Sequence, residues 1–98
     1  MKIPKEIKVG AHIVSIAEVS QIDMDSSGGY DTYYRRIRIR KDKDVPEDIP
    51  AEVLLHEICE AIKHFHNLEI DHNILTTLSE VLFQIIRGNQ LNFLDTSI

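Results

Sequence analysis

The sequence predicts an α+β domain in which a small antiparallel three-stranded sheet packs against an antiparallel two-helix hairpin. Strand-like alternation fills the first half of the chain, and two segments with helical periodicity follow it, an order typical of α+β proteins. The 98 residues, 43% hydrophobic and 28% charged, suit one globular domain. We expect a single domain over 1–98, with the sheet in 1–45, the helical hairpin in 48–88 and a surface tail in 89–98.

Turn-forming residues separate three predicted strands. Residues 6–10 (EIKVG) and 12–22 alternate polar and apolar side chains, and Gly10 between them tolerates the positive φ of a tight turn. Serine, glycine and aspartate predict a loop over 23–31. Residues 32–40 (TYYRRIRIR) predict the third strand, because isoleucine and arginine alternate there with period two.

Charge and composition limit the partners. The net charge of −5 argues against nucleic-acid binding, although residues 35–41 are strongly basic. We interpret those arginines as the solvated face of a strand, with a surface for phosphate or an acidic partner as the alternative. No apolar run reaches the roughly 20 residues of a membrane span, and the N-terminal segment does not resemble a signal peptide. One cysteine, Cys59, cannot form an internal disulfide, which favours a cytoplasmic location.

Two amphipathic helices are predicted in the second half. The first covers 50–66, where Pro50 suits the first turn, and Asn67 follows as a C-terminal residue. The second covers 72–87, with Asp71 as its N-cap. We expect the apolar stripe of the second helix to enter the core; it comprises Ile74, Leu75, Leu78, Val81, Leu82, Ile85 and Ile86.

The first of these helices carries the segment HEICE, which differs from the zinc-peptidase pattern His-Glu-x-x-His in its last residue. His56 and Glu60 lie four residues apart, so they share one helix face and could bind one metal ion. Glu57 is turned by roughly 100° from His56, where it could accept a proton from an attacking water. The alternative is that these residues form the solvated face of an ordinary amphipathic helix.

A third ligand is expected from the second helix. The short link makes the helices antiparallel and places Glu80 opposite His56, on the side of its helix away from the core stripe. His64 and His72 face each other in this pairing, with His66 close to both. They are candidate additional ligands, in a second metal site or in place of the missing histidine. Hydrogen-bonded helix ends are the alternative role.

The segments VLLHEICEAI and LSEVLFQIIRGN resemble the two helices of small zincin-like proteins encoded by phages and prophages, which are minimal relatives of the gluzincin metallopeptidases. The similarity extends over nearly the whole chain and implies a zincin-like fold. It also implies His56 as the first ligand, Glu57 as the general base and Glu80 as the third ligand. Glu60 stands where the family has its second histidine.

Three functions are compatible with these patterns. One imidazole and two carboxylates favour manganese, iron or magnesium relative to a two-histidine zinc set, so we expect a divalent metal of this kind or zinc. The resemblance implies a metal-dependent hydrolase, with a peptide or protein substrate added as a strand along 32–40. The first alternative is a non-catalytic phage-related binding module that uses its edge strand or the basic face of 35–40. The second is a structural protein that dimerises through apolar residues near 91–94 (LNFL).

Overall fold

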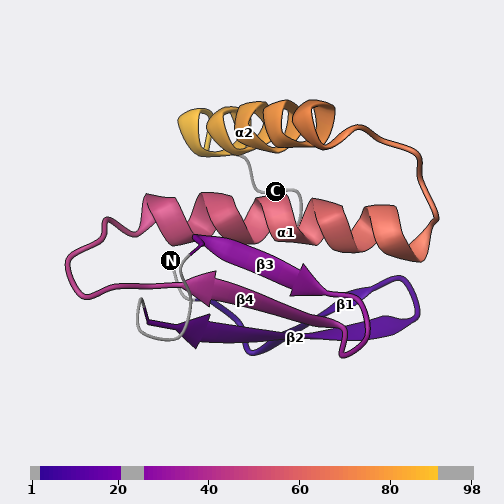
Figure 1. The fold of residues 1–98 in the computed structure, drawn as a ribbon. Helices are drawn as coiled ribbons and strands as arrows, with labels where there is room; N and C mark the ends of the chain where they lie inside the picture. Colours follow the sequence, from indigo (N-terminus) through magenta and orange to yellow (C-terminus); the bar gives the residue numbers. More distant parts are fainter. Residues whose placement is uncertain (1–2, 21–25, 91–98) are drawn as a thin grey trace, which may run out of the picture.

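The structure, a computed structural model, describes residues 3–20 and 26–90, which form a four-stranded mixed sheet and two helices (Figure 1). The α+β class is therefore confirmed. The strands are β1 (Glu6–Val9), β2 (His12–Val19), β3 (Gly28–Asp31) and β4 (Arg36–Arg40), and the helices are α1 (Asp48–Phe65) and α2 (His72–Gly88). Neither helix is long and apolar enough to cross a bilayer. The end of the second predicted strand, at 21–22, and the predicted tail from 91 lie outside the described residues.

The sheet differs from the prediction in strand number and direction. Its order is β1-β2-β4-β3, with antiparallel pairs β1/β2 and β3/β4 and a parallel pair β2/β4. The prediction of three antiparallel strands was wrong because the chain crosses to the far edge and forms β3 before it returns beside β2 as β4. The segment GGYD of β3 has the composition of a turn, and its pairing with β4 makes it a strand.

A tight turn over 32–35 replaces the first part of the third predicted strand. Asp31 Oδ1 accepts hydrogen bonds from the backbone N–H groups of Tyr33, at 2.9 Å, and Tyr34, at 3.1 Å. Arg35 follows with φ of 51°, in the left-handed region. These local bonds hold the chain out of the sheet, so β4 begins at Arg36.

The hydrophobic core lies between the sheet and α1. Ile37 and Ile39 of β4 are fully buried, whereas Arg36 and Arg38 are exposed, which confirms the predicted orientation of this strand. β4 is an inner strand, paired on both edges, so it has no free edge for an added peptide strand, contrary to the prediction. The buried cluster consists of Val9, Val14, Ile16, Ile37, Ile39 and Leu54.

The helices form two further layers, because α1 covers the sheet and α2 lies on the side of α1 away from it (Figure 1). The expected core stripe of α2 was therefore largely wrong. Leu75 is buried and Ile86 is half-buried. The other five side chains are exposed: Ile74, Leu78, Val81, Leu82 and Ile85. The reason is that, among residues 3–20 and 26–90, α1 is the element that packs along α2, and one neighbouring helix cannot cover so wide a stripe.

The link between the helices is set by two local signals, both of which the sequence predicted. Asn67 has φ of 51°, and the N–H of Leu68 donates to the carbonyl of Lys63 at 2.9 Å, which ends α1. Asp71 caps α2 by accepting from the N–H of Asn73 at 2.7 Å. The short link leaves the first turn of α2 beside α1.

Candidate metal centre

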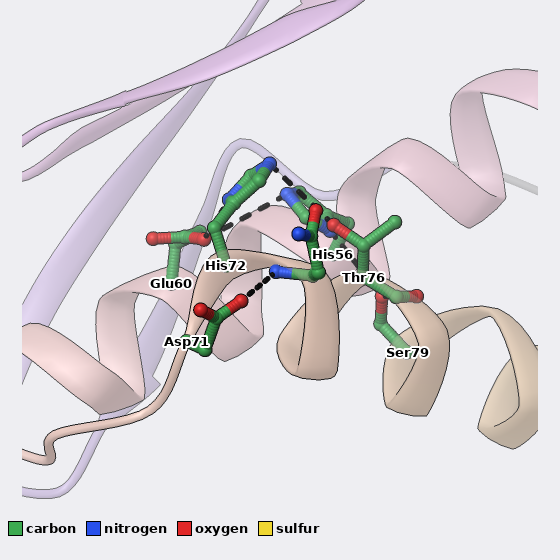
Figure 2. Close-up of polar contacts among 7 residues, drawn as sticks. His56, Glu60, Asp71, His72, Thr76 and Ser79 are labelled. Atoms are coloured by element: carbon green, nitrogen blue, oxygen red, sulfur yellow. Dashed lines mark hydrogen bonds and ion pairs between the residues drawn. The ribbon is translucent and has the colours of Figure 1, made fainter.

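His56, Glu60 and His72 converge where the first turn of α2 meets α1 (Figure 2). His56 Nε2 lies 3.8 Å from Glu60 Oε1, and His72 Nδ1 lies 3.3 Å from the same oxygen. All three candidate ligand atoms lie within 4.8 Å of one another. Two ligands that are each about 2.1 Å from a tetrahedral ion lie roughly 3.4 Å apart. The spacing therefore fits a single divalent cation, and the group could hold a metal ion.

This group contains two of the three ligands expected from the sequence. His56 and Glu60 come together because residues four apart on α1 share a face. His72, considered as an additional ligand, supplies the third donor, and its ring meets that of His56 edge-on with centroids 5.4 Å apart. It reaches this position because it is the first residue of α2, directly after the N-cap.

Glu80, the expected third ligand, lines the same cavity but does not belong to the group of three. Ser79, one residue earlier, is the α2 side chain that forms a hydrogen bond with His56. At His56 the predicted antiparallel pairing was thus offset by one residue, which corresponds to a rotation of about 100° around α2. Metal binding by Glu80 stays a prediction.

Hydroxyl groups of α2 support both imidazoles. Ser79 is 1% exposed, and its hydroxyl donates to the carbonyl of Thr76 at 3.0 Å. Since this bond uses its only hydrogen, Ser79 Oγ can only accept from His56 Nδ1, 3.3 Å away. The bond assigns the proton of His56 to Nδ1 and leaves the Nε2 lone pair directed toward the candidate metal position. His72 Nε2 lies 3.5 Å from Thr76 Oγ1.

Glu57 is a buried carboxyl group beside the cluster. It is 6% exposed, and it lies against β3, where a Cβ on Gly28 would be 3.4 Å from Glu57 Oε2 and would overlap Val53 Cγ1. Glycine at this position thus allows β3 to approach α1 closely. Burial, and then the negative charge of Glu60, raise the pKa of Glu57 from 4.5 to about 7, against an opposite effect of His72. A carboxyl group with this pKa can exchange a proton near neutral pH.

One cavity of about 840 Å³ joins these groups, and β3, α1 and α2 form its walls. Its volume lies in the range of pockets that bind small molecules and cofactors. Lys63 and His64 line it about one helical turn beyond Glu60, and the Tyr30 hydroxyl lies 3.1 Å from His64 Nδ1. The acidic residues that line it are Glu52, Glu57, Glu60 and Glu80.

The remaining candidate histidines do not form a second cluster within residues 3–20 and 26–90. His72 contacts Glu60 in place of His64, contrary to the predicted pairing. His64 instead contacts Tyr30, and His66 is exposed at the end of α1. The register at this end of the hairpin thus differs from the predicted one by four residues, about one helical turn, because His72 pairs with Glu60.

Two features of the site were missed in the sequence. Ser79 carries a usable signal, because His72, Thr76 and Ser79 follow each other at spacings of four and three and so form a polar stripe on one face of α2. That stripe faces the polar side of α1. Gly28 carries no comparable signal, because a glycine in a loop-like segment does not reveal which helix packs on it.

Comparisons with known protein families, with curated proteins and with solved structures found no match for this chain. The fold and the site therefore define an α+β protein with a candidate metal centre between its two helices. The resemblance to zincin-like proteins rests on the helical segments and stays a prediction.

Proposed function

We propose that this protein is a metal-dependent hydrolase that cleaves peptide bonds. The observation that carries the proposal is the convergence of His56, Glu60 and His72 within 4.8 Å in a cavity that also contains the buried Glu57. Two imidazoles and one carboxylate are the ligand composition of many zinc peptidases. With His72 in the set, zinc becomes the preferred cation, and iron(II) is the alternative for such a set. A set with Glu80 as the third ligand would instead favour manganese, iron or magnesium over zinc.

Each residue has a distinct task in this proposal. A divalent cation would supply Lewis acidity, which polarises a peptide carbonyl and makes water a stronger nucleophile. Glu57 accepts the proton of the attacking water at its carboxylate and returns it to the leaving amine. Ser79 orients the ring of His56 through Nδ1. The pKa of about 7 keeps a substantial fraction of Glu57 ionised, and therefore able to act as a base, at neutral pH.

Strand β3 is the proposed docking edge for the substrate. It pairs with β4 on one side and lines the cavity with Gly28, Gly29 and Tyr30. An extended peptide could add to its free edge through main-chain hydrogen bonds, and this would bring a scissile bond past Glu57.

A non-catalytic binding module is the second candidate. The ion pair between His72 and Glu60, at 3.3 Å, favours it, because a protonated His72 would satisfy the carboxylate without a cation. In that case the cavity would bind a partner peptide and leave it intact.

Elemental analysis tests the ligand set. We expect one zinc per chain in the wild type, loss of the metal in His56→Ala and His72→Ala, and retention in Glu80→Ala. Loss in Glu80→Ala with retention in His72→Ala would support the ligand set expected from the sequence. A chain that holds no stoichiometric metal when zinc and manganese are supplied contradicts both sets.

Cleavage of a peptide mixture, followed by mass spectrometry, tests the activity. We expect Glu57→Gln to keep its metal but to lose roughly 10²–10⁴-fold in rate, because the proton acceptor is gone. Glu52→Gln, on the same helix and in the same cavity, is the matched control and should retain the rate. A metal-loaded wild type that cleaves nothing would favour the binding module.

A further inference from the structure

Four apolar side chains of α2 form an exposed row along the helix, which we term the α2 seam. They are Ile74, Leu78, Val81 and Ile85, with exposed fractions of 62%, 53%, 45% and 45%. Their spacings of four, three and four residues are those of the contact positions of a coiled coil. Few large side chains of a monomeric protein stay exposed in so regular an array.

The α2 seam lies opposite the cavity side of α2 and to one side of the contact with α1. At 100° per residue, it lies on the opposite side of α2 from His72 and Thr76, which line the cavity. It is also about a quarter turn from the buried Leu75. α2 stands in the outer layer of the fold, so neither the sheet nor α1 covers this row (Figure 1).

We infer that the α2 seam is the interface of a homodimer, in which the α2 helices of two copies pack antiparallel to each other. The spacing of the seam is symmetric about the midpoint between Ser79 and Glu80. A two-fold axis at that point places Ile74 against Ile85 and Leu78 against Val81 of the second copy. Such self-complementarity is what an isologous interface requires.

Charge also favours a second copy as the occupant. The chain has a net charge of −5, so most faces would repel an identical molecule. The α2 seam contains no charged side chain, and Thr77 and Gln84 on one flank and Leu82 on the other are uncharged. Two copies can therefore approach here without like charges in contact, and their helix dipoles run in opposite directions.

The area of the α2 seam suits a weak, reversible dimer. α2 has 17 residues and is about 25 Å long at 1.5 Å per residue. The seam lies on α2 alone, which is about 10 Å wide with its side chains, so it covers about 250 Å² in projection and more as accessible surface. Stable interfaces bury about 800 Å² per partner. Leu82 of α2 and Ile62 of α1, each 38% exposed, are further exposed apolar side chains of the two helices.

The dimer is independent of the hydrolase proposal, because the two cavities lie on the far side of each α2 from the interface. Sedimentation equilibrium measures it directly. We expect the wild type to show twice the 11.3 kDa of one chain. Leu78→Glu and Val81→Lys should each weaken association by roughly tenfold or more, because each buries an unpaired charge. Ile13→Glu, at an exposed apolar position of β2, is the matched control and should remain dimeric.

Mixing the two seam variants tests the antiparallel register. Leu78→Glu in one copy would face Val81→Lys in the other, so an equimolar mixture should form a heterodimer more stable than either variant alone. A wild type that is monomeric at high micromolar concentration overturns the inference, as does a dimer that survives both seam variants. A mixture that stays monomeric overturns the register. Dimerisation that is lost on truncation after Gln90, but kept in the seam variants, would place the interface in residues 91–98.

Discussion

The two helices have nearly equal length, 18 and 17 residues, but different surroundings. α1 lies between the sheet and α2 and buries five side chains, whereas α2 rests on α1 along one side and buries two. Both segments are amphipathic in sequence. An apolar stripe thus identifies the side of a helix that avoids water, whereas the number of neighbouring elements determines how much of that stripe is buried.

The candidate metal centre shows the same difference in burial between its α1 residues and its α2 residues. α1 contributes the buried Glu57 and the half-buried pair of His56 and Glu60. α2 contributes His72, whose side chain is 69% exposed, together with the buried Ser79. The α1 side of the site is thus held by the core, and the α2 side depends on the contact between the helices. A cation bound by both would tie α2 to α1 and add its binding energy to the stability of the hairpin.

The largest difference is expected in the free energy of unfolding when one leucine of each helix is replaced by alanine. Leu54→Ala on α1 removes a side chain from the core and should lower the free energy of unfolding by about 2–5 kcal/mol. Leu78→Ala on α2 removes a half-exposed side chain and should cost less than about 1 kcal/mol in the monomer. Urea denaturation at protein concentrations that keep the chain monomeric measures both. Equal losses of unfolding free energy in the two variants would mean that the face of α2 that carries Leu78 is covered in solution.

The second expected difference is in the pH dependence of stability, which should depend on Glu57 of α1 and not on Glu80 of α2. The pKa of Glu57 is raised in the folded state to about 7, so the folded metal-free protein binds a proton that the unfolded chain releases above about 4.5. Its stability should therefore fall by roughly 3 kcal/mol as the pH rises from about 4.5 to about 7, and then level off.

Glu57→Gln should remove this pH dependence, whereas Glu80→Gln, at an exposed position, should leave it unchanged. Denaturant titrations of the metal-free proteins at several pH values give the slopes. A slope that is identical in the wild type and Glu57→Gln would show that another group is responsible.

The smallest effect concerns the one polar side chain that α2 buries. Ser79→Ala removes the acceptor for His56 Nδ1 and should weaken zinc binding by about 10- to 100-fold, because the ring loses its fixed orientation. Competition with a chelating dye measures the affinity. Thr77→Ala, on the exposed face of α2, is the control. An unchanged affinity in Ser79→Ala would mean that packing alone orients the imidazole.

Much of the helical half was predictable because its signals are local. The positions of α1 and α2, the cap at Asp71 and the left-handed residue Asn67 follow from side chains a few residues apart. The pairing of His56 with Glu60 follows from the four-residue helical repeat. In the sheet, the burial of alternate isoleucines in β4 was equally local, because the strand period of two is a property of the backbone.

The sequence by itself therefore determined which segments are helical, which face of each is polar, and which two residues of α1 share a candidate metal. Only the tertiary structure decided that β3 is a strand, that β2 and β4 run parallel, and that His72 joins His56 and Glu60 while Ser79 hydrogen-bonds to His56. The physical reason is the range of the interactions involved. Local geometry repeats every two or four residues, whereas a shift of one residue between two packed helices turns a different side chain toward the site.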